Sequence, residues 1–219
     1  MRQLPIIFLL LSSFFCLLFS SCKISKYKRL DCVNIPLTEN NIYPVIKPNK
    51  VLKYNASIDV LKNHLTGLLI IKQTDSLTKH VVFVTELGMK MFDLEVKSME
   101  INAAYVFEPL NKPALIDAIK RNFNNMLLLD IYGKNASFCG SRKGVVYGIT
   151  SGKTKRFFSS VSKQTNNNAI ELQETFHKNK KESKIDYLYN PQSQQYSQIK
   201  CKQYGLIKFY FELNELKTE

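Results

Sequence analysis

The chain has 219 residues, of which 45% are hydrophobic and 22% charged, a balance that excludes a disordered protein and suffices for one domain with a substantial core. Lysine and arginine number 31 against 18 acidic residues, which gives a net charge of +13. The lysines are spread along the sequence and form no basic stripe interleaved with stacking aromatics, so we expect no nucleic-acid partner.

The first residues have the organisation of an export signal. A short positive segment, Met1–Gln3, precedes an apolar run, Leu4–Phe19, that is too short to span a bilayer and has the length of a signal-peptide core. The run ends in Leu18-Phe19-Ser20-Ser21-Cys22, which resembles the lipobox of bacterial lipoproteins. The resemblance implies a signal peptide over residues 1–21 and a covalent lipid on Cys22. The alternative is an ordinary secretory signal cut at the same place.

The segment after Cys22 begins Lys23-Ile24-Ser25-Lys26 and has no aspartate at the next position, which would resemble an inner-membrane retention signal. It also lacks an acidic cluster resembling the surface-export signal of Bacteroidetes lipoproteins. By resemblance to bacterial lipoproteins, the protein is then anchored in the outer membrane and faces the periplasm. Residues 22–52 are polar with isolated apolar positions, which predicts a lipidated tether and lead-in.

Residues 53–219 show the alternation of β-strands. The first half predicts an antiparallel meander of five strands, at Tyr54–Val60, Leu65–Ile71, Val81–Val84, Phe92–Lys97 and Ile101–Phe107. A helix follows, with Asn111 as its cap and Pro113 in its first turn. Its apolar side includes Leu115, Ile119 and Phe123 at helical spacing.

The second half returns to strands, at Val145–Ile149, Arg156–Val161, Ile170–Phe176, Ile185–Tyr189 and Leu206–Leu213. The predicted fold is mainly β: a strongly curved antiparallel sheet or incomplete barrel of about ten strands, with the amphipathic helix on its concave side. That side would present Phe92, Leu94, Val96, Ile170, Leu172, Phe209 and Phe211. These side chains form either a conventional core closed by the helix or a cavity for an acyl chain with the helix as its lid.

Signals for catalysis are weak. His64, His80 and His177 are not spaced as metal ligands or placed beside a nucleophile, and Gly140–Gly144 lacks the spacing of a phosphate-binding loop. We therefore expect no enzyme activity, no metal and no cofactor besides the lipid on Cys22. Asp75-Ser76-Leu77 resembles the O-glycosylation acceptor of Bacteroidetes periplasmic proteins.

Three cysteines, Cys32, Cys139 and Cys201, remain in the mature chain. Their spacings match no zinc pattern. An odd number leaves at least one thiol unpaired in a monomer, and the sequence does not fix the pairing.

The turn between the third and fourth predicted strands, Thr85-Glu86-Leu87-Gly88-Met89, is unusually apolar. Hairpin turns usually carry Asn-Gly or Asp-Gly. A leucine here either protrudes to meet an apolar partner or folds back under a loop.

Together, the lipobox, the meander, the central helix and the terminal strand with Phe209 and Phe211 resemble the LolA/LolB family of lipoprotein carriers and outer-membrane receptors. In the receptors, a leucine followed by glycine protrudes from a matching hairpin, so the resemblance implies that Leu87, Gly88 and Met89 contact membrane or cargo. The chain has no tryptophan, whereas the receptors carry several.

The resemblance implies a monomer that takes acyl chains of lipoproteins, or a related lipid, into its concave face and passes them to outer-membrane lipid. A periplasmic LolA-like carrier would be its partner. The alternative is a non-transporting assembly or scaffold lipoprotein of the same fold with a filled core.

Overall fold

The computed structural model describes residue 27 and residues 32–39, 41–46, 50–75, 78–97, 100–141, 144–160, 169–205 and 207–216. The predicted signal peptide, Cys22, and Ser76 and Leu77 of the glycosylation tripeptide lie outside these ranges. Contacts divide the chain into two units, Met1–Asp31 and Cys32–Glu219, and the second contains the fold described below.

The second unit is mainly β, as predicted, with thirteen described strands and one described α-helix. The helix is α2 (Pro113–Leu127), preceded by a short 3-10 helix, η2 (Glu108–Leu110). The strands are β1 (Cys32–Pro36), β2 (Leu52–Val60), β3 (Asn63–Gln73), β4 (Thr78–Thr85), β5 (Lys90–Lys97), β6 (Glu100–Val106), β7 (Asn135–Ser141), β8 (Gly144–Ser151), β9 (Thr154–Ser160), β10 (Leu172–His177), β11 (Lys180–Asn190), β12 (Gln195–Gln203) and β13 (Phe209–Glu215).

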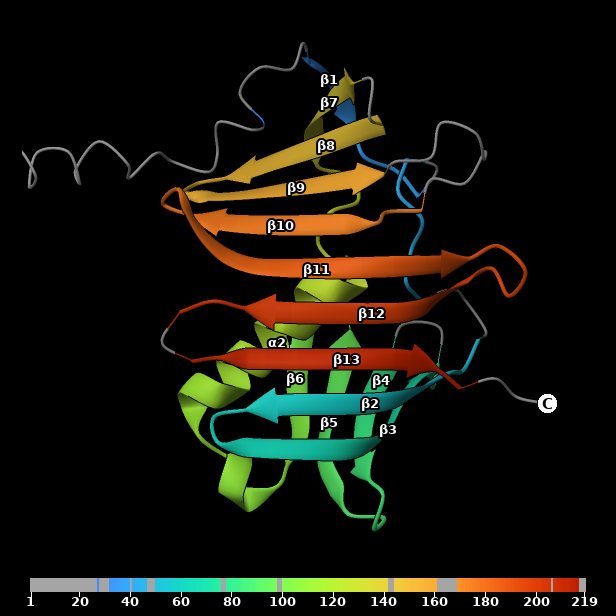
Figure 1. The fold of residues 1–219 in the computed structure, drawn as a ribbon, viewed down its shortest axis with the longest axis vertical. Coiled ribbons are helices and arrows are strands. Elements are labelled where there is room, and N and C mark those ends of the chain that lie inside the picture. Colours follow the sequence, from blue (N-terminus) through green and yellow to red (C-terminus); the bar gives the residue numbers. More distant parts are fainter. Residues whose placement is uncertain are drawn as a thin grey trace, which may run out of the picture. The chain divides into compact units, whose positions relative to one another are not determined.

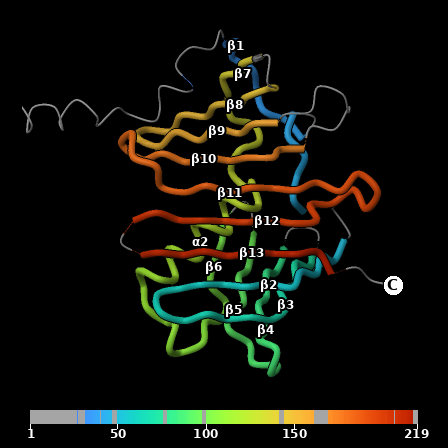
Figure 2. The backbone as a smooth tube through the Cα atoms, viewed as in Figure 1, coloured from blue at the N-terminus to red at the C-terminus, as the bar shows by residue number. Residues whose placement is uncertain are grey.

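All thirteen strands form one antiparallel, curved and unclosed sheet, in the order β1-β7-β8-β9-β10-β11-β12-β13-β2-β3-β4-β5-β6. Two meanders meet where the last strand, β13, pairs with β2, so that red and blue-green segments lie side by side (Figure 2). Because β6 is at one edge and β7 is next to the other, the chain between them must cross the sheet. Helix α2 makes this crossing, beside β6 and β12 (Figure 1).

The folded unit begins earlier than the sequence indicated. β1 pairs with β7 along its whole length, and Leu37, Ile42, Val45 and Ile46 are buried in the main core. Residues 32–46, expected to belong to the tether and lead-in, are therefore part of the fold. Their apolar positions are isolated in the sequence and show no strand or helix period, which is why the pattern did not reveal them.

Sequence reasoning missed three strands, β1, β7 and β12. β1 has only five residues, and β7 is rich in small and polar residues, so neither shows an extended apolar alternation. β12 follows the predicted turn at Pro191, and a register shift between Leu188 and Tyr189 in its partner β11 interrupts the pattern there. The helix cap was also wrong: the N-cap is Lys112, without a side-chain hydrogen bond, while the Asn111 N–H closes η2 onto the Glu108 carbonyl at 3.0 Å.

The cysteine pairing is settled by the strand register. Cys32 of β1 lies opposite Cys139 of β7, and the two form a disulfide with a Cα–Cα distance of 4.4 Å. The bond fastens β1, the edge strand, to its neighbour β7. Cys201 of β12 is a free, buried thiol.

Candidate functional site

The hairpin between β4 and β5 holds Leu87 out in solvent, with 90% of its surface exposed. The Gly88 N–H donates to the Thr85 carbonyl and the Thr85 N–H donates to the Met89 carbonyl, each at 2.9 Å. Gly88 has φ +81°, a conformation that favours glycine. The loop geometry thus requires the glycine but not the leucine, and the alternative that Leu87 folds back under a loop is wrong.

The inner face of the sheet, defined here as the face that packs against α2, contains most of the side chains predicted to line a cavity. Phe92, Leu94, Val96, Ile170, Phe209 and Phe211 are all buried core residues. Leu172 is different: it is only half-buried, and its neighbour Gln173 faces the core opposite Ile185. Since adjacent strand residues face opposite ways, Leu172 lies on the outer face. The inward residues of β10 are polar, which simple alternation of apolar residues did not predict.

The predicted lid residues lie against this inner face. Leu115, Ile119 and Phe123 of α2 are each at most 2% exposed. The Phe123 ring stacks on Phe211 with centroids 5.4 Å apart, and it meets Phe92 edge-on at 5.5 Å. In this half of the inner face, Phe123 occupies the place where a ligand was expected. We call this half, formed by β2–β6 and β13, the dry half.

The other half of the inner face, formed by β8–β12, combines apolar core residues such as Phe158, Ile185 and Ile199 with a row of buried polar side chains, and we call it the wet half. Asn122 of α2 is 1% exposed; its amide donates to the Ala118 carbonyl and to the Gln203 side chain. The Cys201 thiol donates to the side-chain amide oxygen of Asn122, Oδ1, at 3.4 Å. Burial raises the pKa of the Cys201 thiol, so this cysteine stays neutral in the folded protein.

A row of polar side chains crosses four strands of the wet half. Arg156 is opposite Thr175, Thr175 is opposite Ser183, and Ser183 is opposite Gln203. The Thr175 and Ser183 hydroxyls are buried without a hydrogen-bond partner, as is the amide nitrogen of Gln173. Unpaired buried polar groups cost stability. Helix α2 contacts this half through hydrogen bonds of Asn122 with Gln203 of β12 and of the Met126 carbonyl with Tyr187 of β11.

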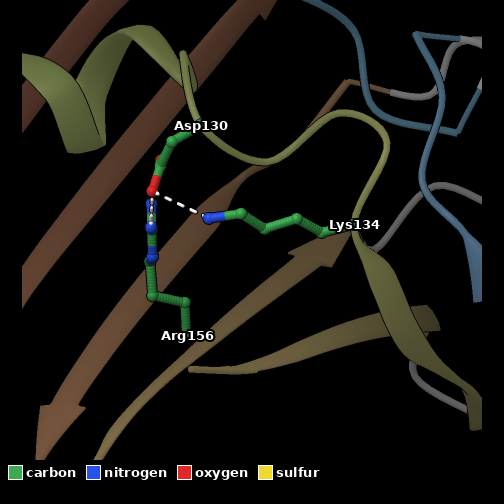
Figure 3. Close-up of polar contacts among 3 residues, drawn as sticks. All are labelled: Asp130, Lys134 and Arg156. Atoms are coloured by element: carbon green, nitrogen blue, oxygen red, sulfur yellow. Dashed lines mark hydrogen bonds and ion pairs between the residues drawn. The ribbon is translucent and has the colours of Figure 1, made fainter. Parts of the chain in front are cut away.

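An ion pair anchors the segment that follows α2 (Figure 3). Arg156 of β9 donates two hydrogen bonds to the Asp130 carboxylate, and the Lys134 ammonium lies 3.3 Å from the same group. Burial opposes ionisation of Asp130, but the hydrogen bonds and charges of Arg156 and Lys134 outweigh it and hold the pKa of Asp130 below its usual value. The bidentate pair therefore pins the crossing chain to the wet half.

The residues considered for catalysis have structural partners. His80 is hydrogen-bonded to Asp93 at 2.6 Å, His64 contacts Asp59, and His177 contacts Thr154 at 3.2 Å. Cys139 is in the disulfide. Among the described residues, no group of three or more histidines, cysteines and carboxylates is placed to hold a metal ion.

No protein-family model matches the sequence, and a search of curated proteins finds no significant similarity. Within the part of the chain that the structure describes, no helix combines the length and apolarity needed to cross a bilayer. The structural features that bear on function are the exposed hairpin with Leu87 and the helix α2 on the inner face of the sheet.

Proposed function

We propose that the chain is a periplasm-facing lipoprotein, anchored in the outer membrane through Cys22, that binds acyl chains on the inner face of its sheet and delivers them to the bilayer. The observation that carries the proposal is the 90% exposure of Leu87 at a hairpin tip that needs only its glycine. Burying a leucine gains about 1.5–3 kcal/mol, which is enough to favour contact with a bilayer without making it permanent.

Acyl binding requires α2 to move, because Phe123 fills the space between Phe92 and Phe211. The wet half supports such movement, since α2 rests there on Asn122 and on strands with unpaired hydroxyls. An acyl chain that replaces Phe123 would meet the same apolar walls. No covalent step is needed, because transfer follows the relative affinities of carrier, receptor and membrane.

A disulfide that pins α2 to the sheet tests the proposal. The Cys201 sulfur lies 3.4 Å from the Asn122 side chain, so Asn122→Cys places a second thiol beside it. We expect the chain from residue 23, which retains the whole folded unit, to bind acylated peptide when reduced and to lose binding when oxidised, as measured by native mass spectrometry. Wild-type protein under the same redox conditions controls for the Cys32–Cys139 bond.

The opposite outcome would reject transport. If neither oxidised nor reduced protein takes up acyl peptide and none co-purifies, α2 is a permanent part of the core. The close packing of Phe123 specifically favours this second candidate, an assembly or scaffold lipoprotein. In that case Leu87→Glu would leave folding unchanged and impair attachment to a protein partner. In a transporter, the same change would impair delivery to the bilayer, so that cargo stays bound to the protein.

A further inference from the structure

Four turns lie at one end of the sheet. Neighbouring strands are antiparallel and Phe209 of β13 is opposite Val60 of β2, so the β2–β3, β8–β9, β10–β11 and β12–β13 turns share that end. In Figure 1 the turns after β2, β10 and β12 lie along the left side, whereas the β4–β5 hairpin projects at the bottom. We call the end with the four turns the basic end, because every one of its turns has an exposed lysine in it or beside it.

These lysines are distant in sequence and are gathered only by the fold. They are Lys62, Lys153, Lys178, Lys180, Lys202 and Lys208. The acidic residues of the same end are Asp59, which contacts His64, and Glu182, which is paired with Arg121. The basic end therefore has an excess of positive charge.

The β2–β3 turn carries a second exposed leucine. Leu61 is 52% exposed and has φ +57°, a conformation that glycine adopts freely and a bulky residue adopts only with strain. Neither the turn nor the core needs a leucine there. Leu61 and Leu87 thus share one feature: each exposes apolar surface in a turn that does not need it.

A cleft of about 440 Å³ opens beside Leu61. Its apolar lining comes from Leu61, Tyr204 and Phe209, and its charged lining from Lys202, Lys208 and one carboxylate, Asp59, which is paired with His64. The Lys202 ammonium lies 5.6 Å from the centre of the Tyr204 ring. An apolar wall beside two ammonium groups suits a molecule with an anionic head and a hydrocarbon tail.

We propose that the basic end binds the headgroups of anionic phospholipid, with Leu61 inserted into the bilayer surface beside them. The inference deepens the proposed bilayer contact of Leu87 by naming the lipid class and a second contact. Charge complementarity decides the partner: a lysine near an anionic surface contributes about a five-fold gain in binding, so several lysines outweigh the apolar area of one leucine.

Tryptophan fluorescence tests the proposal cleanly, because the chain has no tryptophan. The full chain is reconstituted into vesicles of phosphatidylcholine alone or with phosphatidylglycerol. In anionic vesicles we expect Leu61→Trp to emit at shorter wavelength and to be quenched by brominated acyl chains. High salt should reverse the shift. Tyr204→Trp, in the same cleft, serves as a second probe if Leu61→Trp does not fold.

Matched lysine variants supply the control. Lys62→Gln, Lys202→Gln and Lys208→Gln should each weaken the contact about five-fold, and together about a hundred-fold. The same change at Lys53, Lys72 and Lys97, which are exposed near the opposite end, should leave it unchanged. Leu216→Trp, near the end of β13, should show no shift.

The proposal is overturned by an unshifted Leu61→Trp, by equal shifts in neutral and anionic vesicles, or by equal effects of the two lysine sets. Its failure is distinguishable from that of the proposed function. If the emission of Leu87→Trp shifts and that of Leu61→Trp does not, only the lipid contact of the basic end is rejected. A shift at Leu61 without one at Leu87 would support the basic end and remove the role given to the β4–β5 hairpin.

Discussion

Helix α2 packs against two unlike surfaces. Its Phe123 side meets the dry half, where aromatic rings from β5 and β13 close around it. Its Asn122 side meets the wet half, where polar side chains of β9–β12 face inward and several are unpaired. Apolar burial holds the helix over the dry half, and directional hydrogen bonds and one ion pair position the chain over the wet half. If the inner face opens to a ligand, the apolar contact of Phe123 with β5 and β13 is therefore the one that must break.

The largest effect is expected in the dry half. Phe123→Ala removes a fully buried ring between two others and leaves a cavity, so we expect a loss of roughly 4 kcal/mol in the free energy of unfolding. Urea denaturation followed by circular dichroism measures it. Asn124→Ala, on the less buried side of the same helix, should change stability by less than about 0.5 kcal/mol. A loss below about 1 kcal/mol for Phe123→Ala would mean that this half is not a close-packed core.

The next effect is in the wet half, at Asp130. Asp130→Asn leaves the buried Arg156 guanidinium without its carboxylate, and we expect a loss of roughly 3 kcal/mol at pH 7. Folding lowers the pKa of Asp130, so its contribution is complete above the unfolded-state value of about 4 and disappears as the pH falls through the lower folded value.

The pH dependence gives this prediction a specific signature. Between pH 5 and pH 2, wild-type protein should lose the stability due to Asp130, and the Asn variant should lose correspondingly less, as read from urea midpoints across that range. Asp117→Asn, exposed on α2, is the control and should not alter the profile. Parallel acid profiles for wild type and Asp130→Asn would show that the ion pair does not stabilise the fold.

The sequence was informative about the dry half and misleading about the wet half. Phe92, Leu94 and Phe211 alternate with charged residues, and Phe123 has helical spacing, so their burial follows from periodicity alone. In β10 the inward residues are Gln173 and Thr175, which the same rule assigns to solvent. The sequence did contain one indication that polar side chains are buried here. Asn122 lies three residues after Ile119 and four before Met126, on the apolar side of α2.

Strand number and the first boundary of the fold depended on long-range pairing, which periodicity does not report. β1 is defined by a partner more than a hundred residues away, and the Cys32–Cys139 bond has a sequence separation of 107. The basic end also depends on long-range pairing. Its lysines come from turns that are distant in the sequence, and only the antiparallel order places these turns together.

The smallest predicted effect, and the one with opposite sign, tests the unpaired hydroxyls. Thr175→Val replaces a buried hydroxyl that has no hydrogen-bond partner, so we expect a gain of roughly 1 kcal/mol in unfolding free energy. Thr85→Val is the matched control: the Thr85 hydroxyl accepts a hydrogen bond from the Met89 N–H at 3.2 Å, so its loss should be neutral or destabilising.

The double variant Thr175→Val with Ser183→Ala then separates two states of the wet half. Thr175 and Ser183 are opposite each other on β10 and β11, close enough for one water molecule to bridge their hydroxyls. If the site is dry, the two gains add. If a water bridges them, either single change costs stability and the second costs little more, a coupling that a double-mutant cycle measures directly. A hydrated wet half would make the contact of α2 with β11 and β12 easier to open than a dry one, and the lid proposal would then have a defined opening side.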